Sequence, residues 1–214
     1  MKYLIDSTNE QEIAQALEMG VVGVTANPSL YAKGNINFYD FIEKYSKNDI
    51  LLTAEVIGND FEEMLDQVNM LSEISNGEII IKLNYSALGL RLANYLHQKG
   101  IKTAMTLVFD LNQAMLALNA NVEYLFLFVA RNEEIGIDGL EFVRNVSTII
   151  QSKGYEAKVV ASSIRNKFQL QEVALYADYI AVPFQLIADS FHHPLTVSGA
   201  KTFEIDMKKV LEVD

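Results

Sequence analysis

The sequence predicts an α/β fold, a (β/α)8 barrel of the TIM type, made by a single domain over residues 1–214. Eight apolar runs rich in β-branched residues recur along the chain, and most are continuous, as in parallel strands that are covered on both faces. Segments with helical periodicity lie between most of these runs, and this alternation favours a barrel. The main alternative is an open doubly wound sheet. No G-x-G-x-x-G motif follows a strand, which weakens a dinucleotide-binding interpretation.

The predicted strands are short apolar runs, and several of them end in a polar residue. They are expected at 2–6, 20–26, 51–57, 78–83, 102–109, 123–130, 157–163 and 179–183. The fourth run, EIIIKL, is the most informative because Lys82 interrupts three successive isoleucines. Lysine is rarely buried unless it is paired or used.

The predicted helices place apolar residues three or four positions apart. They are expected at 9–20, 60–75, 86–100, 110–120, 138–154, 166–177 and, as an extra C-terminal helix, about 196–212. Gly20 and Gly100 are suited to end a helix, and Ser86 is suited to begin one. No linker or low-complexity tract interrupts the pattern.

Composition excludes several classes of function. The chain has no cysteine and a formal net charge of −11. Disulfides, thiolate metal sites and a cysteine nucleophile are therefore excluded, and the basic footprint of a nucleic-acid-binding protein is missing. No apolar run approaches the roughly 18 residues that span a bilayer, and Asp6 interrupts what would be the apolar core of a signal peptide. A cytoplasmic protein with no membrane or nucleic-acid partner is expected.

Polar side chains stand at the ends of nearly all the predicted strands. They are Asp6, Thr25 with Asn27, Glu55, Lys82, Thr106, Arg131, and Ser163 with Arg165. In a (β/α)8 barrel the carboxyl ends of the strands meet at one face, where the active site lies. One polar strand end is unremarkable because strand ends meet water, but this repetition predicts a reactive site.

Lys82 has two interpretations. Its stem could be buried while its ammonium reaches solvent at the strand end. Alternatively, an amine in an apolar pocket is partly neutral and can attack a carbonyl to form a Schiff base. That chemistry needs a proton-transferring group, for which Asp6 or Glu55 is suited. It also needs a site for the water lost in imine formation, which Glu55 and Thr106 could provide.

Arg131 and Arg165 suit a phosphate group on the substrate. Taken singly, each arginine is more simply interpreted as part of a surface ion pair. Each acid is likewise more simply interpreted as a solvated loop carboxylate or a helix cap. Their joint occurrence at neighbouring strand ends favours the functional interpretation. An acidic chain needs such a local basic pocket to bind an anion.

The chain resembles the small bacterial transaldolases and the closely related fructose-6-phosphate aldolases over nearly its whole length. The resemblance is carried by YLIDST at 3–8, GVTANPSL at 23–30, AEV at 54–56, IIIKL at 79–83, TLVFDLNQA at 106–114, FVAR at 128–131, ASSIRN at 161–166, VP at 182–183 and HPLTVSGAKTFEIDM at 193–207. The Asn-Pro-Ser and His-Pro-Leu-Thr segments are the most specific of these.

The resemblance implies a (β/α)8 barrel with class I aldolase chemistry, no metal and no cofactor. In these families the matching residues are assigned as follows: Lys82 forms the Schiff base, Asp6 takes the proton of the C4 hydroxyl, Asn27 binds the dihydroxyacetone unit, Glu55 and Thr106 hold the catalytic water, and Arg131, Ser163 and Arg165 bind phosphate. Thr25 and Phe128 are expected to line the same substrate site. The resemblance also implies sugar-phosphate substrates and a homo-oligomer, a pentamer or decamer in which the terminal helix contacts a neighbour.

Two positions distinguish the transaldolases from the fructose-6-phosphate aldolases. Transaldolases, which transfer the three-carbon unit to an acceptor aldose phosphate, carry Glu on the third strand and Phe on the sixth. The aldolases, which release it as dihydroxyacetone, carry Gln and Tyr. Glu55 and Phe128 therefore predict a transaldolase. A tyrosine hydroxyl beside the water could favour hydrolytic release, and Phe128 has none.

The donor end of the pocket departs from the family pattern. Ala104 stands where transaldolases carry Asn, and Phe126 stands where they carry Ser. Both missing side chains would hydrogen-bond hydroxyls of the three-carbon unit. This motivates the hypothesis that the enzyme prefers a donor with fewer hydroxyls, such as hydroxyacetone. The alternatives are a fructose-6-phosphate-type aldolase, a slow but ordinary transaldolase, and a catalytically silent barrel that binds a sugar phosphate.

Overall fold

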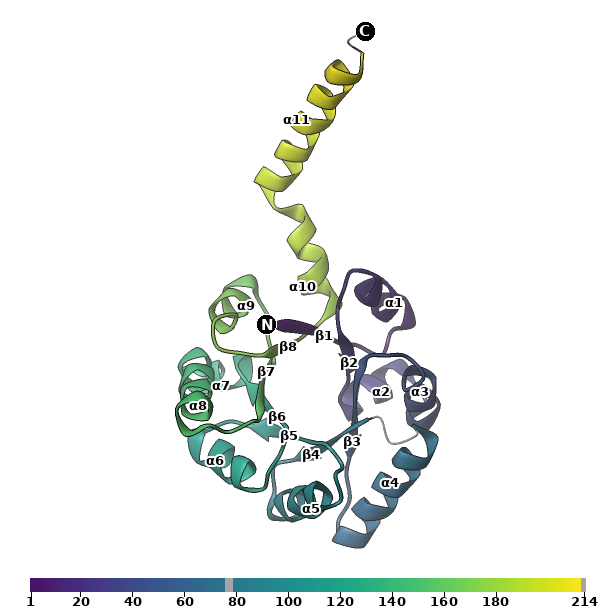
Figure 1. The fold of residues 1–214 in the computed structure, drawn as a ribbon, viewed down its shortest axis with the longest axis vertical. Coiled ribbons are helices and arrows are strands. Elements are labelled where there is room, and N and C mark those ends of the chain that lie inside the picture. Colours follow the sequence, from purple (N-terminus) through teal and green to yellow (C-terminus); the bar gives the residue numbers. More distant parts are fainter. Residues whose placement is uncertain (76–78, 213–214) are drawn as a thin grey trace.

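The computed structural model describes residues 1–75 and 79–212, and its eight parallel strands close into a barrel in the order β1 to β8 (Figure 1). The predicted (β/α)8 fold is therefore confirmed. The strands are β1 Lys2–Asp6, β2 Gly23–Thr25, β3 Leu51–Val56, β4 Ile80–Asn84, β5 Thr103–Val108, β6 Tyr124–Phe128, β7 Lys158–Ser162 and β8 Tyr179–Val182. Glu78, with which the predicted fourth strand began, lies outside the described residues.

Helices surround the barrel, as Figure 1 shows. They are α1 Glu10–Glu18, α2 Pro28–Gly34, α3 Phe38–Tyr45, α4 Phe61–Ile74, α5 Ala87–Gln98, α6 Leu111–Asn119, α7 Ala130–Glu133, α8 Gly139–Lys153, α9 Lys167–Val173, α10 Phe184–Ala188, the 3₁₀ turn η1 Asp189–His192 and α11 Pro194–Leu211. All the predicted helices are present, with ends that differ by a few residues. The short helices α2, α3, α7 and α10 were not among the predicted elements.

Side-chain caps fix where the barrel helices begin. An Asn, Asp or Ser side chain accepts a backbone N–H at the start of α1 to α6, α8 and α9. Such a cap contributes about 1 kcal/mol because it satisfies a donor that the helix itself leaves free. The expected cap Ser86 is one of them, at 2.9 Å from the Gly89 nitrogen. Gly20 and Gly100 adopt the positive φ expected of helix stops.

Two apolar layers hold the barrel together. The outer layer lies between strands and helices, and the inner layer fills the barrel axis. The buried inner residues are Leu4, Ile80, Ala104, Phe126, Val160 and Ala181. Because side chains alternate along a strand, the residues two positions further on face the same interior, one step closer to the carboxyl ends. For Leu4, Ile80, Ala104 and Phe126 those residues are Asp6, Lys82, Thr106 and Phe128.

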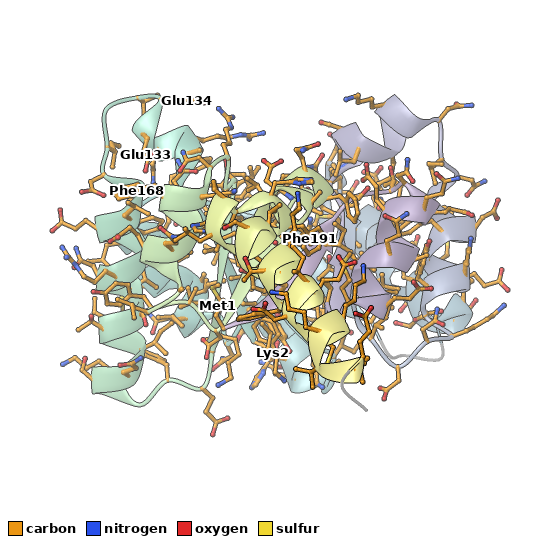
Figure 2. All side chains as sticks on the ribbon, turned by 90° about the horizontal axis from the view of Figure 1, so that it is seen from above. Met1, Lys2, Glu133, Glu134, Phe168 and Phe191 are labelled. Atoms are coloured by element: carbon orange, nitrogen blue, oxygen red, sulfur yellow. The ribbon has the colours of Figure 1, made fainter. Side chains whose placement is uncertain are left out.

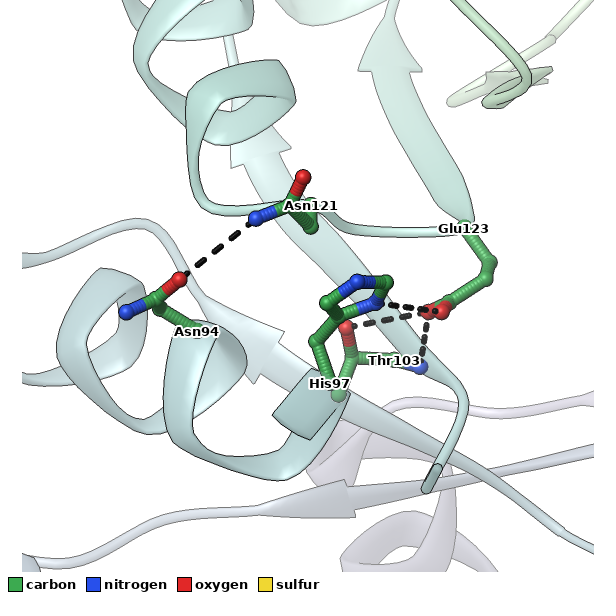
Figure 3. Close-up of polar contacts among 5 residues, drawn as sticks. All are labelled: Asn94, His97, Thr103, Asn121 and Glu123. Carbon is green, nitrogen blue, oxygen red and sulfur yellow. Dashed lines mark hydrogen bonds and ion pairs between the residues drawn. The ribbon is translucent and has the colours of Figure 1, made fainter. Parts of the chain in front are cut away.

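The opposite end of the barrel carries a polar network between α5, β5 and β6 (Figure 3). The Glu123 carboxylate accepts the Thr103 backbone N–H at 2.6 Å, and His97 Nδ1 lies 3.4 Å from it. Asn121 donates to Asn94 beside this group. Glu123 thus ties the start of β5 to the loop before β6. Among the described residues, no cluster of His, Asp and Glu is placed to hold a metal ion.

The C-terminal helix α11 projects away from the barrel (Figure 1). It buries none of its side chains within this chain. Its exposed apolar residues are Leu195, Val197, Phe203, Ile205, Met207, Val210 and Leu211. Within the described ranges, no helix is long and apolar enough to cross a membrane.

Candidate active site

A cavity of about 170 Å³ opens at the carboxyl end of the barrel. It is lined by Asp6, Thr25, Asn27, Lys82, Thr106, Phe126, Phe128, Arg131, Ser162, Ser163, Arg165 and Ala181. These include every residue predicted for the site except Glu55, which reaches it through contact with Lys82. Residues from β1, β2 and β4 to β8, and from the loops that follow them, therefore meet at one place, although larger hollows exist elsewhere on the surface.

Lys82 is buried on the barrel axis, with 4% of its surface exposed. The pairing of β3 with β4 sets Glu55 directly opposite Lys82, and Lys82 Nζ lies 2.9 Å from Glu55 Oε2. Nζ also donates to the backbone oxygen of Ala26 at 2.9 Å, and the Phe126 ring centroid lies 5.5 Å away. The lysine pocket is thus less apolar than expected, because two oxygen acceptors hold the amine.

Asp6 ends β1 and faces the same group. Burial raises the pKa of Asp6 above its usual value; the charge of Lys82 lowers that pKa, and the charge of Glu55 raises it further. A carboxyl group with a raised pKa is closer to the pH at which it can both accept and return a proton. The environment of Asp6 therefore suits a proton-transferring role.

Non-glycine residues with positive φ flank the cavity at two places. Leu107 has φ of 57° where the pairing of β5 with β6 shifts register, directly after Thr106. Ser163 has φ of 56° directly after β7. Such backbone is disfavoured for residues with a side chain, and it is found most often at functional sites. The irregularity at Leu107 ends the regular pairing beside the Thr106 hydroxyl.

The residues at the end of β2 have structural partners as well as a place in the cavity. Asn27 Oδ1 accepts the Leu30 N–H at 3.2 Å and so caps α2, which leaves its amide NH2 free to point elsewhere. The Thr25 hydroxyl lies 2.8 Å from that of Thr53. Among the residues predicted for the site, the helix-capping role that the sequence suggested for the acids is therefore found at Asn27.

The two arginines stand at the rim of the cavity. The Arg131 guanidinium lies 5.2 Å from the centroid of the Phe128 ring, a contact of the cation–π type. Arg165 is paired with Glu134, and its side chain is about half exposed. Figure 2 shows Glu133 and Glu134 toward the opposite end of the barrel from Met1 and Lys2. The simpler interpretation, a surface ion pair, thus holds for Arg165 alongside its place at the cavity.

Comparison with known proteins decides the family. The model of the transaldolase/fructose-6-phosphate aldolase family matches residues 3–213. Proteins named "Probable transaldolase" are similar over 98% of this chain: 38% identity with one from Desulfitobacterium hafniense, covering 100% of that protein, and 39% with one from Geotalea daltonii, covering 99%. The chain belongs to the transaldolase/fructose-6-phosphate aldolase family. The predicted resemblance is confirmed, and the chain is a transaldolase-type enzyme.

This member of the transaldolase/fructose-6-phosphate aldolase family brings residues to its site that the sequence did not single out. Ser162 lines the cavity beside Ser163, because the strand ends between them and the chain turns there. Ala26 contributes only its carbonyl oxygen, which no side-chain pattern reveals. Tyr31, on the unpredicted helix α2, is not among the residues that line the cavity, but the charges of Glu55 and Asp6 act on its hydroxyl. The Asn37 cap and the aromatic spacing after it are the signals that could have revealed α3, and the Asn27-Pro28 pair could have revealed α2.

Proposed function

We propose that this enzyme is a transaldolase that moves a dihydroxyacetone unit from a ketose phosphate to an aldose phosphate through a Schiff base on Lys82. The observation that supports this most is the buried Lys82 amine, 2.9 Å from Glu55 and facing a cavity shared with Asp6, Thr106 and two arginines. A nucleophilic amine with an acceptor for its proton at hydrogen-bond distance is the arrangement that such chemistry requires.

In the first half-reaction Glu55 accepts a proton from the ammonium, and the free amine attacks the C2 carbonyl of fructose 6-phosphate. The carbinolamine loses water, which Glu55 and Thr106 hold, and leaves an iminium. Asp6 then takes the proton of the C4 hydroxyl, the C3–C4 bond breaks, and its electrons move into the iminium. Glyceraldehyde 3-phosphate leaves, and a three-carbon enamine stays on Lys82.

In the second half-reaction the enamine carbon attacks the aldehyde of erythrose 4-phosphate, and Asp6 returns its proton to the new hydroxyl. Water then adds to the iminium and releases sedoheptulose 7-phosphate from Lys82. Arg131 and Arg165 bind the phosphate of each sugar, with Ser163 beside them. Arg165 exchanges its contact with Glu134 for the phosphate, because a dianion competes well for an exposed guanidinium.

The test of this function compares release of glyceraldehyde 3-phosphate from fructose 6-phosphate with and without erythrose 4-phosphate. A transaldolase gives sustained release only with the acceptor, and Glu55 with Phe128 would then be reliable branch markers. Sustained release without the acceptor would make the enzyme an aldolase and those markers wrong. Borohydride trapping of substrate carbon on Lys82 separates either enzyme from a catalytically silent sugar-phosphate-binding barrel, which gives no adduct.

The inner apolar layer supports the hypothesis of a less hydroxylated donor, for the transaldolase or for an aldolase of the fructose-6-phosphate type. Ala104 and Phe126 are both buried there, and the Phe126 ring lies close to Lys82 Nζ. Neither side chain offers a hydrogen bond to a donor hydroxyl. We predict a higher kcat/KM for hydroxyacetone than for dihydroxyacetone as donor, in steady-state assays with glyceraldehyde 3-phosphate as acceptor.

The matched variant for this prediction is A104N/F126S, which restores both polar side chains. It should shift the preference toward dihydroxyacetone, by about fivefold for each hydrogen bond regained if each contributes roughly 1 kcal/mol. A wild-type enzyme that clearly prefers dihydroxyacetone would contradict the hypothesis. In that case the missing partners would merely make an ordinary transaldolase slower.

Helix α11 supports the proposal of a homo-oligomer, for which the family resemblance suggests a pentamer or decamer. Its apolar residues, Phe203, Met207 and Val210 among them, are exposed in the single chain. A hollow of about 620 Å³ lies at its base, lined in part by Leu170, Leu186 and Phe191. We propose that α11 packs on a neighbouring copy, which sedimentation velocity would test.

The cytoplasmic location expected from the cysteine-free sequence stays a prediction.

A further inference from the structure

Tyr31 carries a buried hydroxyl that has no hydrogen-bond partner within residues 1–75 and 79–212. Only 7% of the residue is exposed. A buried polar atom without a partner is rare in native proteins, because the group loses its bonds to water and gains none in return. Tyr31 therefore needs an explanation that packing alone does not supply, since phenylalanine would fill the same space.

The ring of Tyr31 is held firmly. It packs edge-on against Phe38 at 5.2 Å and against Phe41 at 5.3 Å, both on α3. Edge-to-face contacts of this kind fix the ring plane, and a phenol has no further freedom to move its oxygen. The position of the hydroxyl is thus set by the fold.

The segment that carries Tyr31 meets the site through Ala26 and Asn27, and a further hydrogen bond joins it to the end of the β1 loop. Ala26 accepts the hydrogen bond of Lys82, Asn27 lines the cavity and caps α2, and Thr8, two residues after Asp6, donates to Leu30 at 3.3 Å. Tyr31 follows directly. The pKa of the Tyr31 hydroxyl is raised by three causes, which are burial, the charge of Glu55 and the charge of Asp6, in order of decreasing size. The hydroxyl consequently stays protonated and can only act as a donor toward these acids.

We propose that Tyr31 is a positioning residue of the active site, whose hydroxyl donates a hydrogen bond through a water molecule to the carboxylates of Glu55 and Asp6. Such a water has the polar partners that a buried water requires, one phenol and two carboxylates. The proposal rests on the proposed function, in which these two acids transfer the protons.

The role has a pH signature. A hydrogen bond donated to a carboxylate favours its charged form and lowers its pKa. Loss of the Tyr31 hydroxyl should therefore raise the pKa of Asp6 further. The other charged groups that face this acid, Glu55 on β3 and Lys82 on β4, are unchanged by the substitution, and so are Arg131 and Arg165 across the cavity.

The experiment compares Y31F with Y45F in the full-length enzyme. Tyr45 is a good control because it is buried in the same aromatic group, with its ring 4.6 Å from that of Phe41, while the charges that act on it are those of Lys44 and Glu10. In Y31F the acidic limb of the pH profile of kcat/KM, which follows the deprotonation of Asp6, should move to higher pH by about 0.5 to 1 unit. A shift of this size corresponds to the loss of one modest hydrogen bond. In Y45F it should stay in place.

An acidic limb that is identical in Y31F, Y45F and the wild type would overturn the proposal. If the wild type itself gives no turnover and no borohydride adduct on Lys82, the proposed function fails instead. The role of Tyr31 is then decided by urea unfolding of Y31F, E55Q and Y31F/E55Q. The proposal expects Y31F to lower the unfolding midpoint less in the E55Q background than in the wild type. Equal shifts in both backgrounds would refute it.

Discussion

Replacing Lys82 with methionine is expected to lower kcat by at least about 10⁴-fold, the scale on which enzymes lose activity when a covalent nucleophile is removed. Methionine is close to lysine in length and apolar, so it fills the same space on the barrel axis while removing the amine. Without it no iminium forms, and the C3–C4 bond has no electron sink. The measurement is release of glyceraldehyde 3-phosphate from fructose 6-phosphate with the acceptor present.

The control for this prediction is K102M. Lys102 is exposed and lies just before β5, near the Glu123 network at the opposite end of the barrel. This variant should keep the wild-type rate and should still acquire a borohydride-trapped adduct, whereas K82M should acquire none. If K82M is folded by circular dichroism and retains more than about a hundredth of the wild-type rate, Lys82 is not the nucleophile.

Much of this site could be predicted because strand geometry is simple. Apolar runs that are covered on both faces give the barrel, and the barrel gathers the carboxyl ends of its strands. The strand-end positions of Lys82, Thr106 and Asp6 therefore predicted that these three side chains lie close together. The same logic placed Glu55 on the neighbouring strand, although the direct register between Glu55 and Lys82 depends on how β3 and β4 slide past each other, which no local pattern specifies.

The parts that could not be predicted depend on loops and on backbone atoms. The Ala26 carbonyl that holds Lys82 is common to every residue type, so it leaves no trace in the sequence. Tyr31 and Phe38 look like ordinary aromatic residues until α2 and α3 fold against each other. The pairing of Arg165 with Glu134 joins the loop after β7 to the end of α7, a distant contact that depends on tertiary structure.

Replacing Glu55 with glutamine is expected to lower the free energy of unfolding by about 3 kcal/mol, because it leaves the Lys82 charge buried without its partner. Both side chains of the pair are almost fully buried, at 5% and 7% exposure. The Ala26 carbonyl remains as an acceptor but carries no full charge. Urea unfolding monitored by circular dichroism would measure the loss.

The comparison that makes this prediction specific uses an exposed pair. Glu43 pairs with Lys47 at 2.9 Å, with more than half of each side chain exposed. E43Q should therefore change stability by less than about 0.5 kcal/mol, as surface pairs do. The double variant K82M/E55L removes both charges and should recover most of the stability lost in E55Q, because two apolar side chains replace an ion pair that is costly to bury.

E55Q also has a predicted effect on pH dependence, opposite in sign to that of Y31F. The negative charge of Glu55 is one of the causes that raise the pKa of Asp6, so its removal should lower that pKa. Any residual activity of E55Q should then show an acidic limb displaced to lower pH. A displacement to higher pH, or a stability loss no larger than that of E43Q, would mean that Glu55 is not the charged partner of Lys82 and Asp6, and the proton path through it would have to be abandoned.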